Sequence, residues 1–355
     1  MPGGEERAVD DLAWLIRTEL GEEAAVLTRD SARLSSRRAA AGLLAGGLGP
    51  RSVAKAVRRS GARVVHAHNV HPSFGWRALA AARDAGARVV LHLHNYRFVC
   101  AIGTCFTRGE DCTRCHGRDT LPGVRLNCRG ARAEAVAYGA GLSLWQNRIA
   151  ANVDAYVVPS EFALGRLREL GAPVDGRARV IPSVQRSFAA ASRAAAGRFA
   201  LAAGRLTPEK GFADAVRACA AAGVPLVVAG DGPQLDELRA LGGDVRFTGR
   251  VAADELAALR REAALAIVPS RYAEILPLAA LEAMAAGLPV VAARAGGLAE
   301  IVPEEGLYPP GDAAALAARI RALWADAAAG ERALAVARER TAPAVVADAL
   351  REVYR

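Results

Sequence analysis

The chain has 355 residues and a net charge of +9, with 52% hydrophobic and 23% charged residues. This length predicts about two domains with sizeable cores, and the composition is that of a soluble protein. No uninterrupted apolar run reaches the ~20 residues that a membrane-spanning helix needs. The basic residues are scattered rather than gathered into one block with aromatics, which argues against a specific nucleic-acid partner. An anionic substrate or an acidic membrane surface stays open.

The first residues predict neither a signal peptide nor an opening strand. Residues 1–11 carry acids where a signal peptide needs a basic region, so we expect a cytoplasmic protein. A glycine turn at 2–4 is followed at once by a helical pattern. A doubly wound domain ordinarily opens with a strand that becomes central to its sheet, so the first N-terminal strand is expected to be missing. Either the natural chain starts further upstream or another segment fills the gap.

Short β-branched runs alternate with helical stretches rich in Ala, Leu and Arg, a pattern typical of parallel sheets covered by helices. In the first half, strands are predicted at 24–28, 62–68, 87–94, 155–160 and 178–183. In the second half, they are predicted at 199–204, 225–230, 245–249, 265–270 and 289–293. Residues 184–197 have weak periodicity and are interpreted as a linker. A last helix, 341–355, is predicted to start near Pro343. The fold class is therefore α/β, with two doubly wound Rossmann-like units.

Two strand-to-helix turns in the second half are candidate ligand-binding turns, and the first of them suits a diphosphate. The first, GRLTPEKG at 204–211, combines glycines with Arg205 and Lys210, so that backbone N–H groups and two cations can meet phosphate oxygens. Lys210 is one of only two lysines among 46 basic residues. The second turn, AGDGP at 229–233, follows the next predicted strand and includes Gly230. Ordinary turns with solvated side chains are the alternative reading of both.

Two glutamates follow in the segment 269–302. Glu274 lies in a loop after a predicted strand, and Pro277 suits the first turn of the next helix. Glu282 stands inside the apolar run LAALEAMAA, where a carboxylate is costly unless it is hydrogen-bonded. Carboxylates accept hydrogen bonds from sugar hydroxyls, and the free N–H groups at 277–279 suit a phosphate. An exposed helix face is the alternative for Glu282.

Five motifs of the second half occur together in one order: GRLTPEKG, AGDGP, FTGRV, Glu274-x7-Glu282 and GLPVVAARAGGLAEIV. With these motifs, the chain resembles the retaining family 4 glycosyltransferases of the GT-B fold. The resemblance covers nearly the whole chain. The first half is similar to a bacterial subgroup with PGGE near the start, VVHAHN, LHNYRFVC and a cysteine-bearing insertion. The chain departs from the family pattern in three respects. It has Ile275 where an aromatic residue is usual, its first strand is missing, and the segment IPSVQ at 181–185 lacks the Asn-Gly often found there.

The resemblance implies roles for particular residues. Arg205 and Lys210 would bind the donor diphosphate, Glu274 the donor sugar, and Glu282 the ribose hydroxyls. His94 would face the sugar across a cleft between the domains. The catalytic set is thus Glu274, His94, Arg205 and Lys210. The remaining donor-binding residues are Gly3, Gly4, Gly204, Gly230, Arg250, Leu276, Pro277 and Leu278, together with Glu282. Catalysis would need no metal and would proceed with retention of anomeric configuration.

The resemblance also gives the expected organisation. Residues 1–185 would form an acceptor-side domain and 198–335 the domain that binds the nucleotide sugar, while 336–355 would cross back to the first. The acceptor is an unidentified hydroxyl compound, either a polysaccharide or lipid-linked intermediate or a small secondary metabolite. Two other classes stay open: a catalytically impaired binding protein on the same fold, and a zinc-containing nucleic-acid binder. Peripheral membrane contact is a further expectation.

Histidines and cysteines gather in the first half. His66 and His68 end one predicted strand and His92 and His94 the next, and alternate residues on a strand share a face. They favour a cleft lining or core packing over a metal site. Four cysteines, Cys100, Cys112, Cys115 and Cys128, have spacings that allow a structural zinc site, with Cys105 and His116 as spare ligands. Reduced thiols and a regulatory disulfide are the alternatives for the insertion at 100–130.

Overall fold

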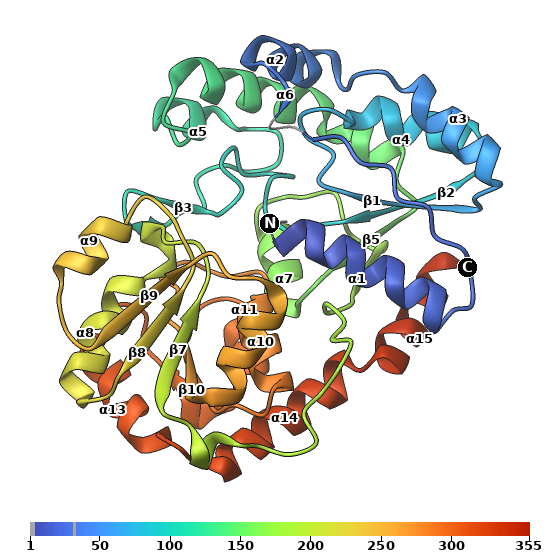
Figure 1. Cartoon of the computed structure of the whole chain (residues 1–355). Coiled ribbons are helices and arrows are strands. Elements are labelled where there is room, and N and C mark those ends of the chain that lie inside the picture. The colour runs from blue at the N-terminus through green and yellow to red at the C-terminus, as the bar shows by residue number, and fades with distance from the viewer. Residues whose placement is uncertain (1–3, 31–32) are drawn as a thin grey trace. The chain divides into compact units, whose positions relative to one another are not determined.

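The computed structural model describes residues 4–30 and 33–355. By their contacts, the residues divide into two compact units (Figure 1). The N-terminal unit contains the chain up to residue 107, then 111–182 and 346–355. The C-terminal unit contains residues 108–110 and 183–345. Both units are parallel sheets with helices on two faces, which confirms the prediction of two Rossmann-like units.

The N-terminal unit is built on four parallel strands in the order β1-β2-β5-β6. These are β1 (Val64–His68), β2 (Arg88–His92), β5 (Ala155–Val158) and β6 (Ala178–Val180). Its helices are α1 (Gly4–Thr18), α2 (Ser36–Ala45), α3 (Arg51–Ser60), α4 (Gly75–Asp84), α5 (Leu121–Arg125), α6 (Arg132–Ala151), α7 (Glu161–Glu169) and α15 (Pro343–Tyr354). In the described part of this unit, α1 is the first element.

The strand predicted at 24–28 is wrong, because this segment has no regular structure. Val26 and Leu27 are both 47% exposed. A strand needs a neighbour that satisfies its backbone N–H and C=O groups, and the β-propensity of single residues does not replace that neighbour. Within the described sheet, β1 pairs with β2 alone, so this segment does not add a strand to the other edge of β1.

The C-terminal unit holds six parallel strands in the order β12-β11-β10-β7-β8-β9. They are β7 (Phe199–Ala203), β8 (Leu226–Ala229), β9 (Val245–Gly249), β10 (Ala263–Val268), β11 (Val290–Ala293) and β12 (Leu307–Tyr308). The helices are α8 (Phe212–Ala222), α9 (Leu235–Ala240), α10 (Ala253–Glu262), α11 (Leu278–Ala285), α12 (Leu298–Ile301), α13 (Ala313–Leu323) and α14 (Ala327–Thr341). The first five strands match the predicted ones closely, whereas β12 has two residues and was not predicted.

Alternating residues of the strands pack into two hydrophobic cores, one on each face of this sheet. Leu201 and Val227 pack with Met284 of α11 in one core. Val228 and Phe212 of α8 belong to the other core. Figure 1 shows α8 and α13 on one side of the strands and α10 and α11 on the other. Strands buried on both faces explain why these segments read as continuous apolar runs.

Candidate active site

A buried ion pair joins the two most specific motifs of the C-terminal unit. The Nζ atom of Lys210 lies 2.6 Å from Oε1 of Glu274, and Glu274 is only 4% exposed. Two hydroxyls also donate to this carboxylate: Ser270 Oγ to Oε1 at 2.5 Å and Tyr272 Oη to Oε2 at 2.6 Å. The carboxylate is therefore held by one cation and two hydroxyl donors, which satisfies the requirement for burying a charge.

Tyr272 contacts both members of the pair. Its hydroxyl accepts from Lys210 Nζ at 3.2 Å, and the Lys210 ammonium stands 5.0 Å from the centre of the Tyr272 ring. Burial and the charge of Glu274 raise the pKa of Tyr272 well above its usual value. The phenol therefore stays protonated and keeps donating to Glu274.

Backbone and side-chain bonds fix the loop of Lys210 to the loop of Glu274. Arg271 N donates to the carbonyl of Glu209 at 2.9 Å. The Arg271 guanidinium makes two bonds, of 2.8 and 2.6 Å, to the carboxylate of Asp214, which lies in the first turn of α8. Asp214 is 2% exposed. A bidentate pair of this kind adds geometric constraint as well as energy.

Two glycines are required where the backbone segments meet. A Cβ on Gly230 would lie 1.8 Å from the carbonyl oxygen of Gly204, so the two candidate ligand-binding turns are adjacent. A Cβ on Gly296, where φ is 62°, would lie 2.2 Å from the carbonyl oxygen of Glu274. Gly297 N also donates to that carbonyl at 2.7 Å. The turns at 204 and 230 thus meet each other, and the turn at 296 meets the Glu274 segment. These turns lie at the carboxyl ends of β7, β8 and β11, where open α/β sheets bind ligands.

The other predicted donor-binding residues lie around this centre or beside it. The side chain of Arg205 is 73% exposed and stands 4.0 Å from Glu209. Arg250 is exposed directly after β9. Leu276 and Leu278 are half-buried and Pro277 is buried. The helix α11 begins at Leu278, so Pro277 is its N-cap rather than a residue of its first turn.

Glu282 does not lie on an exposed helix face. Its side chain is 13% exposed and forms an ion pair with Arg260 of α10, whose side chain is 8% exposed. This pair supplies the hydrogen bond that a carboxylate in an apolar run needs. Arg260, Ser270 and Tyr272 were not predicted as site residues from the sequence. Their sequence signal is weak: only the segment PSRYAE places two hydroxyl side chains within four residues of Glu274.

The remaining predicted site residues belong to the N-terminal unit. His94 follows β2, and its Nε2 lies 2.6 Å from Nδ1 of His68. Burial lowers the pKa of His94 to about 4, while the nearby Glu5 carboxylate acts in the opposite direction. Glu5 accepts from the side-chain amides of Asn69 and Asn95, each at 2.7 Å. Gly4 is the first residue of α1, and Gly3 lies outside the described residues.

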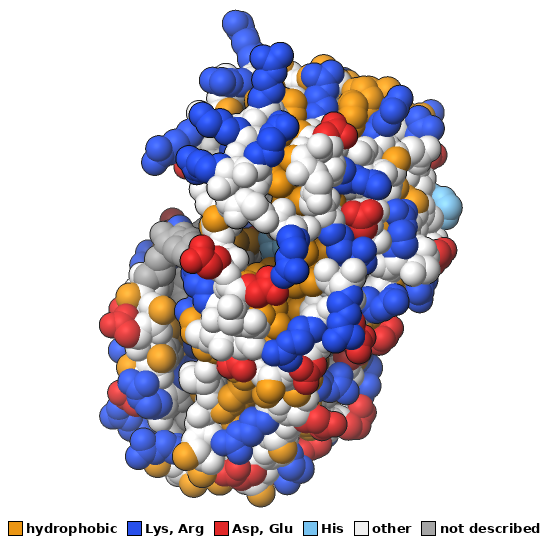
Figure 2. All heavy atoms as spheres, turned by 90° about the vertical axis from the view of Figure 1, so that its right-hand side faces the viewer, with side chains coloured by type: hydrophobic (Ala, Val, Ile, Leu, Met, Phe, Trp, Pro, Cys, Tyr) orange, Lys and Arg blue, Asp and Glu red, His pale blue; other side chains and the backbone are white. Residues whose placement is uncertain are grey.

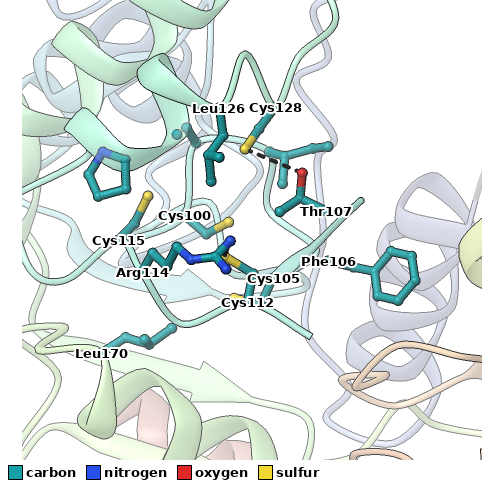
Figure 3. A pocket seen from close by; sticks show the side chains of 14 residues that line it. Cys100, Cys105, Phe106, Thr107, Cys112, Arg114, Cys115, Leu126, Cys128 and Leu170 are labelled. Carbon is teal, nitrogen blue, oxygen red and sulfur yellow. Dashed lines mark hydrogen bonds between the residues drawn. The ribbon is translucent and has the colours of Figure 1, made fainter. Parts of the chain in front are cut away.

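The cysteine insertion contains a short hairpin, β3 (Phe106–Thr107) and β4 (Glu110–Asp111), beside a small pocket. Five thiols line this pocket in Figure 3, those of Cys100, Cys105, Cys112, Cys115 and Cys128. A hydrogen bond from Cys105 lowers the pKa of Cys100 to about 6, and the same bond raises the pKa of Cys105. Burial raises the pKa of Cys115 to about 11.

The convergence of these thiols does not by itself make a metal centre. Among the described residues, the groups of three or more possible ligand atoms close enough for one ion consist of histidines, not cysteines. The four-cysteine zinc site therefore stays a prediction.

Basic side chains are spread over the face shown in Figure 2 and are dense toward its top. The helices α2 and α3 contribute six exposed cations: Arg37, Arg38, Arg51, Lys55, Arg58 and Arg59. The opposite side of α3 is apolar and buried through Val53, Ala54 and Val57. In the described ranges, no helix combines the length and apolarity that crossing a membrane requires.

Comparison with known proteins defines the class. The fold matches that of Anabaena HepE in complex with UDP and glucose, with a TM-score of 0.65 and 20% identity. The match covers 99% of this chain and 96% of the HepE chain. Sucrose-phosphate synthase of Thermosynechococcus elongatus matches over 86% of this chain and 76% of that one, with a TM-score of 0.61 and 23% identity. The two parallel-sheet units therefore form a GT-B fold.

The family follows from the sequence. A model described as "Glycosyl transferase 4-like domain" matches residues 3–183, and one described as "Glycosyl transferases group 1" matches residues 197–326. The chain belongs to glycosyltransferase family 4, as its motifs indicate.

Curated relatives match a part of the chain. Glycogen synthase of Mycobacterium tuberculosis is 41% identical over 152 residues, which is 39% of this chain and 36% of that protein. Sulfoquinovosyl transferase SQD2 of Arabidopsis thaliana is 42% identical over 120 residues, or 32% of this chain and 23% of that protein. The matched segments thus span well under half of the length of these relatives.

Proposed function

We propose that this protein transfers a glycosyl residue from a nucleoside-diphosphate sugar to a hydroxyl acceptor, with retention of anomeric configuration. The observation that carries the proposal is the buried Lys210–Glu274 pair beside the glycine turns of β7 and β8. The names of the relatives support the reaction class, since glycogen synthase and a sulfoquinovosyl transferase are both glycosyl-transferring enzymes. The complex of HepE with UDP and glucose supports the donor class.

Lys210 has one donor left for a phosphate. An ammonium group carries three N–H donors. Two of them serve Glu274 and Tyr272, at 2.6 and 3.2 Å. The third, with the exposed guanidinium of Arg205, suits the oxygens of a diphosphate. Because negative charge develops on the leaving diphosphate, preorganised cations of this kind contribute ~10²–10³ in rate per good donor.

Glu274 has capacity left for a sugar hydroxyl. A carboxylate offers about four acceptor positions. Oε1 accepts from Lys210 and Ser270, while Oε2 accepts from Tyr272. One position on Oε2 thus suits a hydroxyl of the donor sugar, which orients the ring without covalent chemistry. Glu282, steadied by Arg260, is proposed to accept from the ribose hydroxyls.

In the proposed reaction, the bond from the anomeric carbon to the diphosphate oxygen breaks, and its electron pair stays on the diphosphate. The acceptor oxygen forms the new bond from the same face, and its proton passes to the departing diphosphate oxygen. Neither glutamate acts as a nucleophile. The two cations do the work that a metal ion otherwise does, so we propose metal-independent catalysis.

The two units take different parts in this scheme. Residues 198–335 are proposed to bind the donor, and residues 1–185 the acceptor, with His94 directed at the sugar. A peripheral contact with an anionic membrane is also proposed. It is supported by the six exposed cations of α2 and α3, where each basic side chain near such a surface contributes about 1 kcal/mol.

A thermal-shift panel of nucleoside diphosphates tests the donor class. A ligand that binds the native state raises its melting temperature, by an amount that grows with concentration over Kd. We expect one nucleoside diphosphate to raise Tm and its nucleoside to have little effect. NMR of the product anomer, with the matching sugar donor, then tests retention. No response to any member of the panel would contradict the donor site.

A further inference from the structure

Four histidines form a continuous patch on one face of β1 and β2. The parallel register places His68 opposite His92 and His66 opposite Val90. Side chains two residues apart on a strand share a face. The ring centres of His66 and His68 are 4.8 Å apart, and those of His68 and His92 are 5.1 Å apart. His94 stacks on His92 at 3.9 Å. Four imidazoles thus share one small area.

Several nitrogens of this patch are buried without a hydrogen-bond partner among the described residues. They are Nε2 of His66 and both ring nitrogens of His92. His92 is 9% exposed. Native proteins rarely bury polar atoms without a partner, since each one costs about 1–3 kcal/mol. Neither packing nor the proposed sugar transfer accounts for these nitrogens.

In His66 and His68, the Nδ1 atom of the ring has a hydrogen-bond partner. His66 Nδ1 lies 2.7 Å from the hydroxyl of Tyr354 in α15, and His68 Nδ1 lies 2.6 Å from His94 Nε2. When Nδ1–H is the donor in these bonds, Nε2 of each ring carries a lone pair. This is the arrangement found around metal-binding histidines, whose second ring nitrogen donates to a neighbouring group.

We propose that His66, His68 and His92 bind one transition-metal cation, Zn²⁺ by preference. One ligand nitrogen from each of the three lies within 4.8 Å of the others. Zinc–nitrogen bonds of ~2.0–2.1 Å in tetrahedral geometry place ligand nitrogens ~3.4 Å apart. Small side-chain rotations, of about an ångström at the nitrogens, close that difference. Three imidazoles favour zinc, copper or nickel over magnesium or calcium.

A bound ion would give the orphaned nitrogens a partner and tie the carboxyl ends of β1 and β2 together. Through Tyr354, it would also brace the last helix against this sheet. Three protein ligands leave a fourth position for water. The predicted effect is therefore on folding stability and metal content, and both are measured without an activity assay.

The test uses the full chain, freed of metal with a chelator and titrated with Zn²⁺ by calorimetry. We expect the wild type to bind one equivalent more than the double variant His66→Gln with His92→Gln. The wild type should also show a higher Tm with Zn²⁺ than without it. His71→Gln is the matched control, because His71 Nε2 is likewise buried without a partner but lies outside the two strands. Its zinc stoichiometry should equal that of the wild type.

Two further measurements keep the proposal testable if the double variant fails to fold. Tyr354→Phe keeps all three ligands and removes one outer bond, so zinc affinity should fall about 10- to 100-fold. A Cys112→Ser, Cys115→Ser variant loaded with Co²⁺ should keep a nitrogen-ligand absorption spectrum without thiolate charge transfer. Equal stoichiometry and affinity in the double variant and the wild type would overturn the proposal. A Tyr354→Phe affinity equal to that of the wild type, with no cobalt bound in the cysteine variant, would overturn it as well.

Discussion

The hydroxyl of Tyr272 donates to Oε2 of Glu274 at 2.6 Å, whereas the hydroxyl of Tyr308 is buried without a partner in the described part of the chain. Both phenols belong to the same unit, but only one of them contacts the proposed catalytic pair. This contrast provides a matched pair of substitutions.

Tyr272→Phe removes a hydrogen bond to a charged group, and such bonds contribute about 1.5–3 kcal/mol. We expect kcat to fall by about 10-fold because Glu274 loses its orientation, while the Kd of the nucleoside diphosphate changes little. Tyr308→Phe should keep wild-type kinetics and equal or higher Tm, since it removes an unsatisfied polar atom. Steady-state kinetics of both variants check this. Equal losses in the two would refute the positioning role of Tyr272.

Lys210→Ala tests the diphosphate contact. It removes a charge-assisted donor, so the Kd of the nucleoside diphosphate should rise about 10- to 100-fold. The Kd of the nucleoside, which lacks phosphates, should stay unchanged. Isothermal titration of both ligands measures the difference. The matched control is Lys55→Ala, which removes the other lysine of the chain, an exposed residue of α3. A Lys210→Ala variant that binds both ligands like the wild type would exclude the proposed contact.

Glu282→Gln tests the ribose contact. Replacing the carboxylate by an amide weakens the acceptor, so the Kd of the nucleoside diphosphate should rise about 10-fold. The 2′,3′-dideoxy analogue should bind the variant and the wild type alike, because it lacks the hydroxyls. Glu262→Gln is the control: Glu262 pairs with Arg198 on the surface, where such pairs contribute little. A loss of affinity that is the same for both nucleotides would argue for a purely structural role.

The cysteine insertion offers a separate metal test. If Cys100, Cys112, Cys115 and Cys128 hold zinc, elemental analysis of the purified protein should find it. The Cys112→Ser, Cys115→Ser variant should lose one equivalent and melt at a lower temperature, since structural zinc stabilises the fold directly. Cys219→Ser, which changes a lone buried thiol of α8, should keep the zinc content. Equal zinc content in all three proteins would rule out the cysteine site.

The sequence predicted β8 and β10 of the C-terminal unit because each is an apolar run buried on both faces. It failed at 24–28, where the β-branched Val26 favours a strand but the segment pairs with no strand of the described sheet. Propensity is a property of the segment, whereas pairing depends on the rest of the sheet.

The candidate active site, like the fold, was predicted in part from the sequence. Lys210 and Glu274 lie in recognisable motifs, and the structure brings them into contact. The pairing of Glu282 with Arg260 was not predictable, since helical periodicity does not say which residue of another helix a side chain meets. The shared face of the strand-end histidines follows from alternation, but their orphaned nitrogens are visible only in three dimensions.

The most direct test of the account is the turnover of nucleoside-diphosphate sugars by Glu274→Gln. The substitution keeps the size of the side chain and removes its charge, so the fold and the donor site should persist. We predict that the wild type and Tyr308→Phe release nucleoside diphosphate from one sugar donor in the presence of acceptor. Glu274→Gln should bind the nucleoside diphosphate with wild-type affinity but turn over at least about 100-fold more slowly. Turnover by Glu274→Gln at the wild-type rate would contradict the assignment of this carboxylate to the active site.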